Sequence, residues 1–187
     1  MIIENGKGDG GYGAAVNDKN QLLTRSTSTP ELLFHSKEDE DVFSTYNKHT
    51  IQADDTEEYV CYLKYTGDSI LILKKMFVSC NDMTNACKFE VYVDLTSPGG
   101  GADVTPSNWN RKSNNSIDTV TKHTNSGASA ITGTNGTEIM CFYSKPEEGM
   151  KEISLDGLIL GTNNNIFIIA ENKAGNKVRV TLHYYED

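Results

Sequence analysis

A strict alternation of apolar and polar residues in the stretch CKFEVYVDL, residues 87–95, places the strongest constraint on how this chain can fold. In an extended strand its two faces would carry different residue types, with Phe89, Val91, Val93 and Leu95 on one face and Lys88, Glu90, Tyr92 and Asp94 on the other. Because side chains of a strand point to opposite faces in turn, this pattern predicts a half-buried β-strand.

Other runs rich in strand-forming residues are separated by turn-forming ones, at residues 59–65, 69–79, 138–143, 154–160, 165–171 and 177–185. We expect a bulge or bend near Lys74 and Lys75. The short Gly/Asn segment between the last two runs predicts a β-hairpin. No helical period of convincing length lies between these strands. The chain is therefore predicted to be all-β, an antiparallel β-sandwich of jelly-roll-like type.

The front of the chain differs from the rest. Residues 1–30 are predicted to be an extended, glycine-rich docking arm, and residues 31–187 a β-sandwich domain. Within that domain the strand signal becomes consistent only from residue 58. Residues 31–50 could open a short helix or form a strand that leads into an acidic loop. Residues 96–136 are a long polar stretch with short strand candidates such as 129–132.

Gly8, Gly10 and Gly13 match the G-x-G-x-x-G fingerprint of a dinucleotide-binding turn. That turn needs a buried strand before it and a helix after it. Here only Ile2 and Ile3 precede the glycines, and an Asn/Asp turn follows them. We interpret the match as accidental and expect no cofactor. The glycines instead allow the arm to take positive φ without strain.

Charge and hydropathy exclude two classes of partner. The net charge of −9 repels polyanions, and no basic cluster is large enough for a nucleic-acid footprint. No apolar run approaches eighteen residues, so no membrane span is expected. The first residues do not have the pattern of a signal peptide, which favours assembly in the cytoplasm.

No catalytic or metal-binding pattern stands out. The four cysteines contain no C-x-x-C pair, so we expect free thiols and no structural metal. Cys61, Cys87 and Cys141 fall in strand-like runs, where a thiol packs as a small hydrophobe. The histidines are scattered, and His183 is expected to be a packed or edge residue rather than a base. The chain is predicted not to be an enzyme.

Trp109 is the sole tryptophan and lies in a polar loop beside Arg111. It could anchor that loop in the core. Alternatively, it could be an interface or carbohydrate-stacking residue, because Trp and Arg are enriched at binding hot spots.

Two stretches carry a resemblance to a known family. The segment IENGKGDGGYGAAV, residues 3–16, with Asn20 and Leu22 after it, is similar to an N-terminal arm of small structural proteins of tailed bacteriophages. The segment GGGADVTPSNWNRKS, residues 99–113, resembles a loop of the same group. This chain departs from the group in an extra glycine at Gly11 and in Trp109, where an aliphatic residue is usual.

The resemblance implies a non-enzymatic virion protein, a capsid decoration, head-vertex or neck/tail accessory subunit. Its expected partners are other virion proteins and further copies of itself, in a homo-oligomer such as a trimer. The alternative is a receptor- or carbohydrate-binding module of a phage fibre, and a glycan-cleaving enzyme on the same scaffold ranks third. The predicted assembly contacts are Tyr12, Val16, Leu22, Leu23, Trp109 and Arg111.

Overall fold

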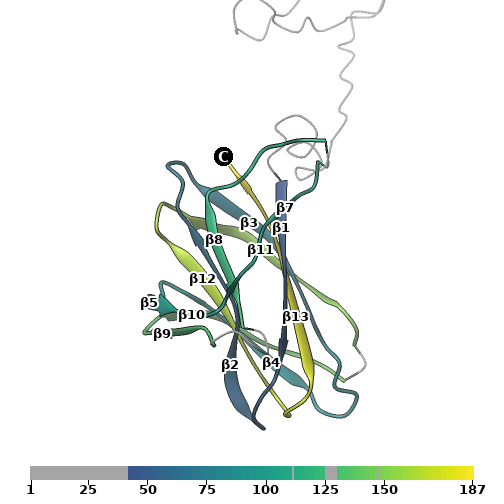
Figure 1. The fold of residues 1–187 in the computed structure, drawn as a ribbon. Coiled ribbons are helices and arrows are strands. Elements are labelled where there is room, and N and C mark those ends of the chain that lie inside the picture. The colour runs from purple at the N-terminus through teal and green to yellow at the C-terminus, as the bar shows by residue number, and fades with distance from the viewer. Residues whose placement is uncertain (1–41, 111, 125–129, 147) are drawn as a thin grey trace, which may run out of the picture. The chain divides into compact units, whose positions relative to one another are not determined.

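The computed structural model describes residues 42–110, 112–124, 130–146 and 148–187, which form strands joined by turns without any helix (Figure 1). Every strand pair in this part of the chain is antiparallel. The prediction of an all-β, antiparallel fold is therefore confirmed. The predicted arm, residues 1–30, and its boundary with the domain lie outside the described residues.

One sheet has five strands in the order β11-β3-β13-β1-β7. The first and last long strands of the described chain, β1 and β13, lie side by side over their whole length, from Val42 opposite Tyr185 to Thr50 opposite Lys177 (Figure 1). The bounds of the five strands are β1 Val42–Thr50, β3 Leu71–Cys80, β7 Ser107–Asn108, β11 Lys151–Leu160 and β13 Lys177–Glu186.

A second sheet has six strands in the order β10-β4-β12-β2-β8-β6, and β5 and β9 form a separate two-stranded sheet. The bounds in the six-stranded sheet are β2 Thr56–Tyr65, β4 Cys87–Val93, β6 Ala102–Asp103, β8 Thr119–His123, β10 Thr137–Ser144 and β12 Asn165–Asn172. The two short strands are β5 Thr96–Gly99 and β9 Thr132–Thr134.

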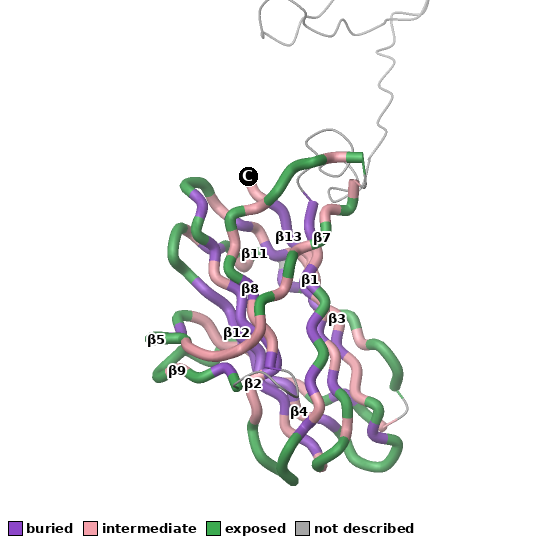
Figure 2. The backbone as a smooth tube through the Cα atoms, in the orientation of Figure 1, coloured by how far each residue is buried: buried purple, intermediate pink, exposed green. Residues whose placement is uncertain are grey.

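The residues that the sequence left ambiguous include a full strand. In β1, Thr45, Asn47 and His49 are buried while Tyr46 and Lys48 are exposed, as the alternating colours in Figure 2 show. The local sequence pattern did not predict this strand, because its inward-facing positions carry polar rather than apolar residues. Of the alternatives that the sequence left open for residues 31–50, a strand is therefore found at residues 42–50.

The main core collects buried side chains from both large sheets. Val78, Val180 and Leu182 come from the five-stranded sheet, and Phe89 and Ile168 come from the six-stranded one. All five are completely buried. Removing apolar surface from water in this way makes the largest favourable contribution to the stability of a domain.

A smaller core lies on the other side of the six-stranded sheet. Tyr62 and Phe167 from that sheet pack there with Leu95 and Ile131, which flank β5 and β9. Strand β12 therefore has buried residues on both faces, which explains its nearly continuous apolar sequence.

The predicted hairpin of the last two strands is wrong. Strand β12 pairs with β2 and β4, whereas β13 pairs with β1 and β3 in the other sheet. The turn between them, with Gly175 at φ +84°, therefore crosses from one sheet to the other. Both strands are central in their sheets, so each already has a partner on either side.

The register of β3 against β13 shifts between the pairs Lys75–His183 and Leu73–Tyr184, which confirms the bulge predicted near the lysines.

The polar stretch 96–136 holds more strand than its composition suggested, since β8 pairs with β2 from Tyr65 to Cys61. The described residues contain no helix with the length and apolarity that crossing a membrane requires.

Candidate functional site

The outward face of the five-stranded sheet carries a group of exposed or half-buried aromatic and apolar side chains. Tyr46, Thr181 and Phe77 are aligned across β1, β13 and β3 by the strand register. Tyr46 is 55% exposed and Met150 is 70% exposed. We call this group the aromatic patch; it comprises Tyr46, Phe77, Trp109, Met150, Thr181 and His183.

Trp109 lies at one end of the aromatic patch, directly after β7. Its backbone N–H donates to the carbonyl of Val42 over 2.8 Å, which fixes the loop against β1. Its indole meets the ring of His183 edge to face, with the ring centroids 4.7 Å apart. The side chain is 39% exposed, so the interpretation of Trp109 as a core anchor is wrong.

His183 contacts two other rings of the aromatic patch. Its ring centroid lies 4.9 Å from that of Phe77 on the side of β3, in addition to its contact with Trp109. Together with Met150 and Thr181, the rings of Phe77 and His183 line a hollow of about 190 Å³. Burial lowers the pKa of His183, and the charge of Lys75 lowers it further, so the imidazole is neutral near pH 7. His183 is a packed residue, as expected from the sequence.

The structure brings together only part of the predicted contact set. Trp109 lies in the aromatic patch, whereas Arg111 and the arm residues Tyr12, Val16, Leu22 and Leu23 lie outside the described residues. Sequence reasoning missed Tyr46, Phe77 and Met150. For Phe77 a signal existed, because once the bulge at Lys74 shifts the alternation, Phe77 falls on the polar face of β3.

The outward face of the six-stranded sheet is chemically different, because it carries a lysine among carboxylates. The Lys88 ammonium lies 2.7 Å from Glu90, 2.9 Å from Glu57 and 3.7 Å from Glu171. The hydrogen bond to Glu90 is the main cause of a raised pKa for Lys88. This lysine therefore stays charged and neutralises part of the acidic surface.

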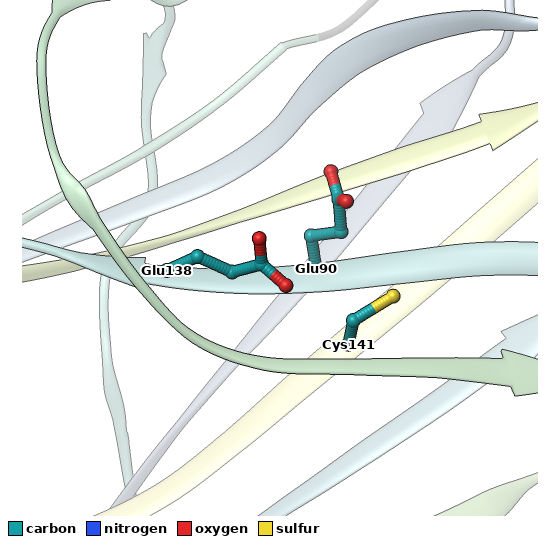
Figure 3. A group of neighbouring side chains, drawn as sticks. All are labelled: Glu90, Glu138 and Cys141. Atoms are coloured by element: carbon teal, nitrogen blue, oxygen red, sulfur yellow. The ribbon is translucent and has the colours of Figure 1, made fainter.

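Beside Lys88, the side chains of Glu90, Glu138 and Cys141 converge (Figure 3), with potential ligand atoms that all lie within 4.8 Å of one another. Burial and the charge of Glu90 raise the pKa of the Cys141 thiol, so it remains protonated and is a poor ligand. Lys88 already supplies a positive charge to Glu90. Cys141 is exposed, so the expectation that it packs as a small hydrophobe was wrong.

A third feature is the pair of buried His49 and half-buried Glu58 in a hollow of about 270 Å³ lined by residues of β1, β2 and the segments beside them. His49 Nε2 lies 2.5 Å from Glu58 Oε2, and His49 Nδ1 lies 3.2 Å from the carbonyl oxygen of Thr124. Because both ring nitrogens are already engaged, His49 has none left to act on a substrate. The pair instead holds the 50–55 turn, since Glu58 Oε1 accepts the N–H groups of Gln52 and Ala53.

Of these three features, the aromatic patch has the composition of a binding surface, because Trp, Tyr, Phe and Met are enriched at protein interfaces. Comparison of the chain with protein-family models, curated proteins and solved structures finds no match.

Proposed function

We propose that this chain is a structural subunit of a tailed-bacteriophage virion, such as a capsid decoration, head-vertex or neck/tail accessory subunit, and that it acts by protein–protein assembly. The observation that carries the proposal is the exposed aromatic patch around Trp109. Exposed apolar groups of this kind mark interaction sites when they are contiguous and bordered by polar residues. Lys48 and the ion pair of Lys75 with Glu152 provide such polar neighbours on the same sheet.

The proposal includes a jelly-roll β-sandwich, which the strand order supports. The strands of seven or more residues are β1, β2, β3, β4, β10, β11, β12 and β13. Their order is β11-β3-β13-β1 in one sheet and β10-β4-β12-β2 in the other. Successive long strands thus alternate between the sheets except for β4 and β10, which are neighbours in one sheet. This order supports the proposal, because jelly rolls, which occur in viral capsid and lectin domains, are built from eight strands in two Greek keys.

The glycine-rich residues 1–30 are, in this proposal, an extended docking arm. Tyr12, Val16, Leu22 and Leu23 would supply its apolar anchors, with the aromatic patch as a second contact surface. Deletion of residues 1–25 is expected to leave the melting temperature of the domain little changed while incorporation into particles falls. Unfolding of the truncated chain would instead make the segment an integral part of the domain.

Mass spectrometry of purified phage particles tests the proposal directly. The chain is expected in the particles at a fixed copy number relative to the major capsid protein. Its absence from particles would overturn the proposal, and the measured copy number would distinguish a decoration protein from a fibre component.

A matched pair of tyrosines tests the role of the aromatic patch. Tyr46 and Tyr143 are 55% and 56% exposed, but Tyr143 belongs to β10 in the other sheet. Tyr46→Ala and Trp109→Ala are expected to weaken self-association in light scattering and incorporation into particles, whereas Tyr143→Ala is not. Equal effects of the Tyr46 and Tyr143 substitutions would remove the patch from the proposal.

A second candidate is a receptor- or carbohydrate-binding module of a phage fibre. It is favoured by the exposed rings of Trp109 and Tyr46, because aromatic faces can stack on sugar rings. A glycan array probed with the isolated full chain distinguishes the two functions. Binding that is lost with Trp109→Ala would support the second candidate over the first.

A further inference from the structure

We propose that Asn135 is a site of spontaneous modification, at which the folded chain reacts with water, loses ammonia and converts the asparagine into aspartate and isoaspartate. Asn135 and Gly136 are the two residues between β9 and β10, and we call them the Asn-Gly loop. The two strands belong to different sheets, so a change of the backbone in this loop acts on the connection between those sheets. The site is independent of the aromatic patch and of the proposed function.

The backbone of the Asn-Gly loop accounts for both residue types. Gly136 has φ +134°, and a Cβ at this position would lie 2.7 Å from the Phe167 ring. Asn135 has φ +58°, in the left-handed region where asparagine is enriched among residues that carry a side chain. The fold therefore favours an asparagine directly before a glycine. Because glycine has no side chain, it leaves its own backbone nitrogen open to the preceding asparagine.

The Asn-Gly loop is open to solvent and is not held by hydrogen bonds. Asn135 and Gly136 are both exposed. Within the described ranges of the chain, neither residue makes a hydrogen bond through its backbone, and the Asn135 amide has no partner. The reaction requires the Gly136 nitrogen to approach the Asn135 Cγ atom, which needs a rotation of the Asn135 backbone. A loop without hydrogen bonds permits such a rotation at little cost in free energy.

Asn163 provides a matched comparison within the same chain. It is also exposed and has φ +70°. The next residue, however, is Asn164, whose backbone N–H donates to the carbonyl of Gly161 over 2.9 Å. The N–H of Asn163 itself donates to the carbonyl of Tyr65, also over 2.9 Å. The nitrogen that would attack is therefore engaged and carries a residue with a side chain. Exposure and positive φ alone would make the two asparagines equally reactive, whereas the proposal assigns the reaction to Asn135.

The chemistry balances in two steps and involves no redox change. The Gly136 nitrogen loses its proton to hydroxide and attacks the Asn135 Cγ carbon. The bond from Cγ to the amide nitrogen then breaks, ammonia leaves with the proton returned to it, and a succinimide ring remains. In the second step water attacks one of the two ring carbonyl carbons and opens the ring. Attack at Cγ gives aspartate, whereas attack at the backbone carbonyl carbon gives isoaspartate.

The two products affect the domain differently. Aspartate keeps the backbone as it was and adds one negative charge to a chain whose net charge is −9. Isoaspartate adds the same charge but routes the chain through the side chain, which lengthens the backbone by a methylene group. Gly136 lies close to the Phe167 ring of the smaller core, and packed interiors yield little to added volume. The longer backbone is therefore expected to disturb the smaller core.

The test follows the folded full chain over time at pH 8, with peptide mass spectrometry to detect the replacement of the amide nitrogen by oxygen at each asparagine. Asn135 is expected to convert within about tenfold of the rate in a free peptide of residues 131–140, because its loop opens at little cost. Asn163 should convert about tenfold or more slowly than Asn135. Stronger protection of Asn135 than this, or equal rates at the two asparagines, would overturn the proposal.

Two substitutions separate the added charge from the lengthened backbone. The aged chain, with isoaspartate detected by enzymatic methylation, should melt about 2–4 °C below the fresh chain. Freshly purified Asn135→Asp carries the charge without the longer backbone and should melt like the fresh chain. Asn135→Gly tolerates positive φ but cannot form the ring, so its melting temperature should not change with age. An equal decrease in fresh Asn135→Asp or in aged Asn135→Gly would overturn the effect assigned to isoaspartate.

Discussion

Trp109 and His183 meet edge to face, with their ring planes at 86° and their centroids 4.7 Å apart. Trp109 is the sole tryptophan, so its fluorescence reports on this one contact. Protonation of His183 places a positive charge beside the indole and is expected to change the emission. Because burial lowers the pKa of His183, we expect the midpoint of this change below the ordinary histidine value of about 6.5. His183→Gln should abolish the transition.

The same lowered pKa predicts how stability depends on pH. In the unfolded chain His183 binds its proton at a higher pH than in the folded chain. Its contribution to the free energy of unfolding is therefore fully present above about pH 6.5 and is lost as the pH falls toward the folded-state pKa. Urea denaturation between pH 7.5 and 5 checks this, and a smaller pH dependence is expected for His183→Gln. An unchanged dependence in that variant would refute the assignment to His183.

Substitutions of Glu58 test its interaction with buried His49. Glu58→Ala should lower the free energy of unfolding by about 3 kcal/mol, because His49 and two backbone N–H groups lose their acceptor. Glu58→Gln should cost less than about 1 kcal/mol. Its amide can donate to Nε2 of a neutral His49, whose Nδ1–H donates to the carbonyl of Thr124. Equal losses for the two variants in urea denaturation would contradict this account.

Lys88 is expected to be more important than an ordinary surface lysine. Lys88→Met leaves Glu90, whose side chain is 8% exposed, without its partner and should cost about 3 kcal/mol. Adding Glu90→Gln should recover most of that loss, which a double-mutant cycle measures. The control is Lys122→Met, whose partner Asp103 is 85% exposed, and it should cost less than about 1 kcal/mol.

Two glycines with positive φ, when substituted by alanine, distinguish the energetic cost of backbone strain from that of steric crowding. A Cβ at Gly136 would lie 2.7 Å from the Phe167 ring, whereas a Cβ at Gly157 would meet nothing within 4 Å. Gly157→Ala should therefore cost about 1 kcal/mol for strain alone. Gly136→Ala should lower the free energy of unfolding by about 1–3 kcal/mol more than Gly157→Ala, because the packed Phe167 ring of the smaller core has little room to move. Thermal unfolding of the two variants gives the comparison.

The sequence predicted those elements whose buried faces are apolar. The alternation in residues 87–95 correctly placed Phe89 and Val91 in the core, and the paired lysines of β3 marked a real bulge. The sequence pattern did not predict strand β1, because Asn47 and His49 occupy its buried face, where apolar residues are expected. The hairpin prediction failed because strand partners are chosen across the whole domain, which local turn residues do not encode.

The candidate site was predictable only in part. Trp109 stood out because it is the sole tryptophan in a polar loop. Its neighbour His183, and Phe77 beyond it, come from strands far away in sequence, and the register of β3 against β13 brings them to the same face.

The pairing of β1 with β13 also affects how the protein is made. The residue opposite Val42 is Tyr185, so the five-stranded sheet lacks a central strand until β13 has been synthesised. Folds that depend on such distant pairings form slowly, and their unpaired strand edges can aggregate in the meantime. On the ribosome, this domain should therefore stay incomplete until β13 has left the exit tunnel, and a chain terminated before β13 should not form the five-stranded sheet.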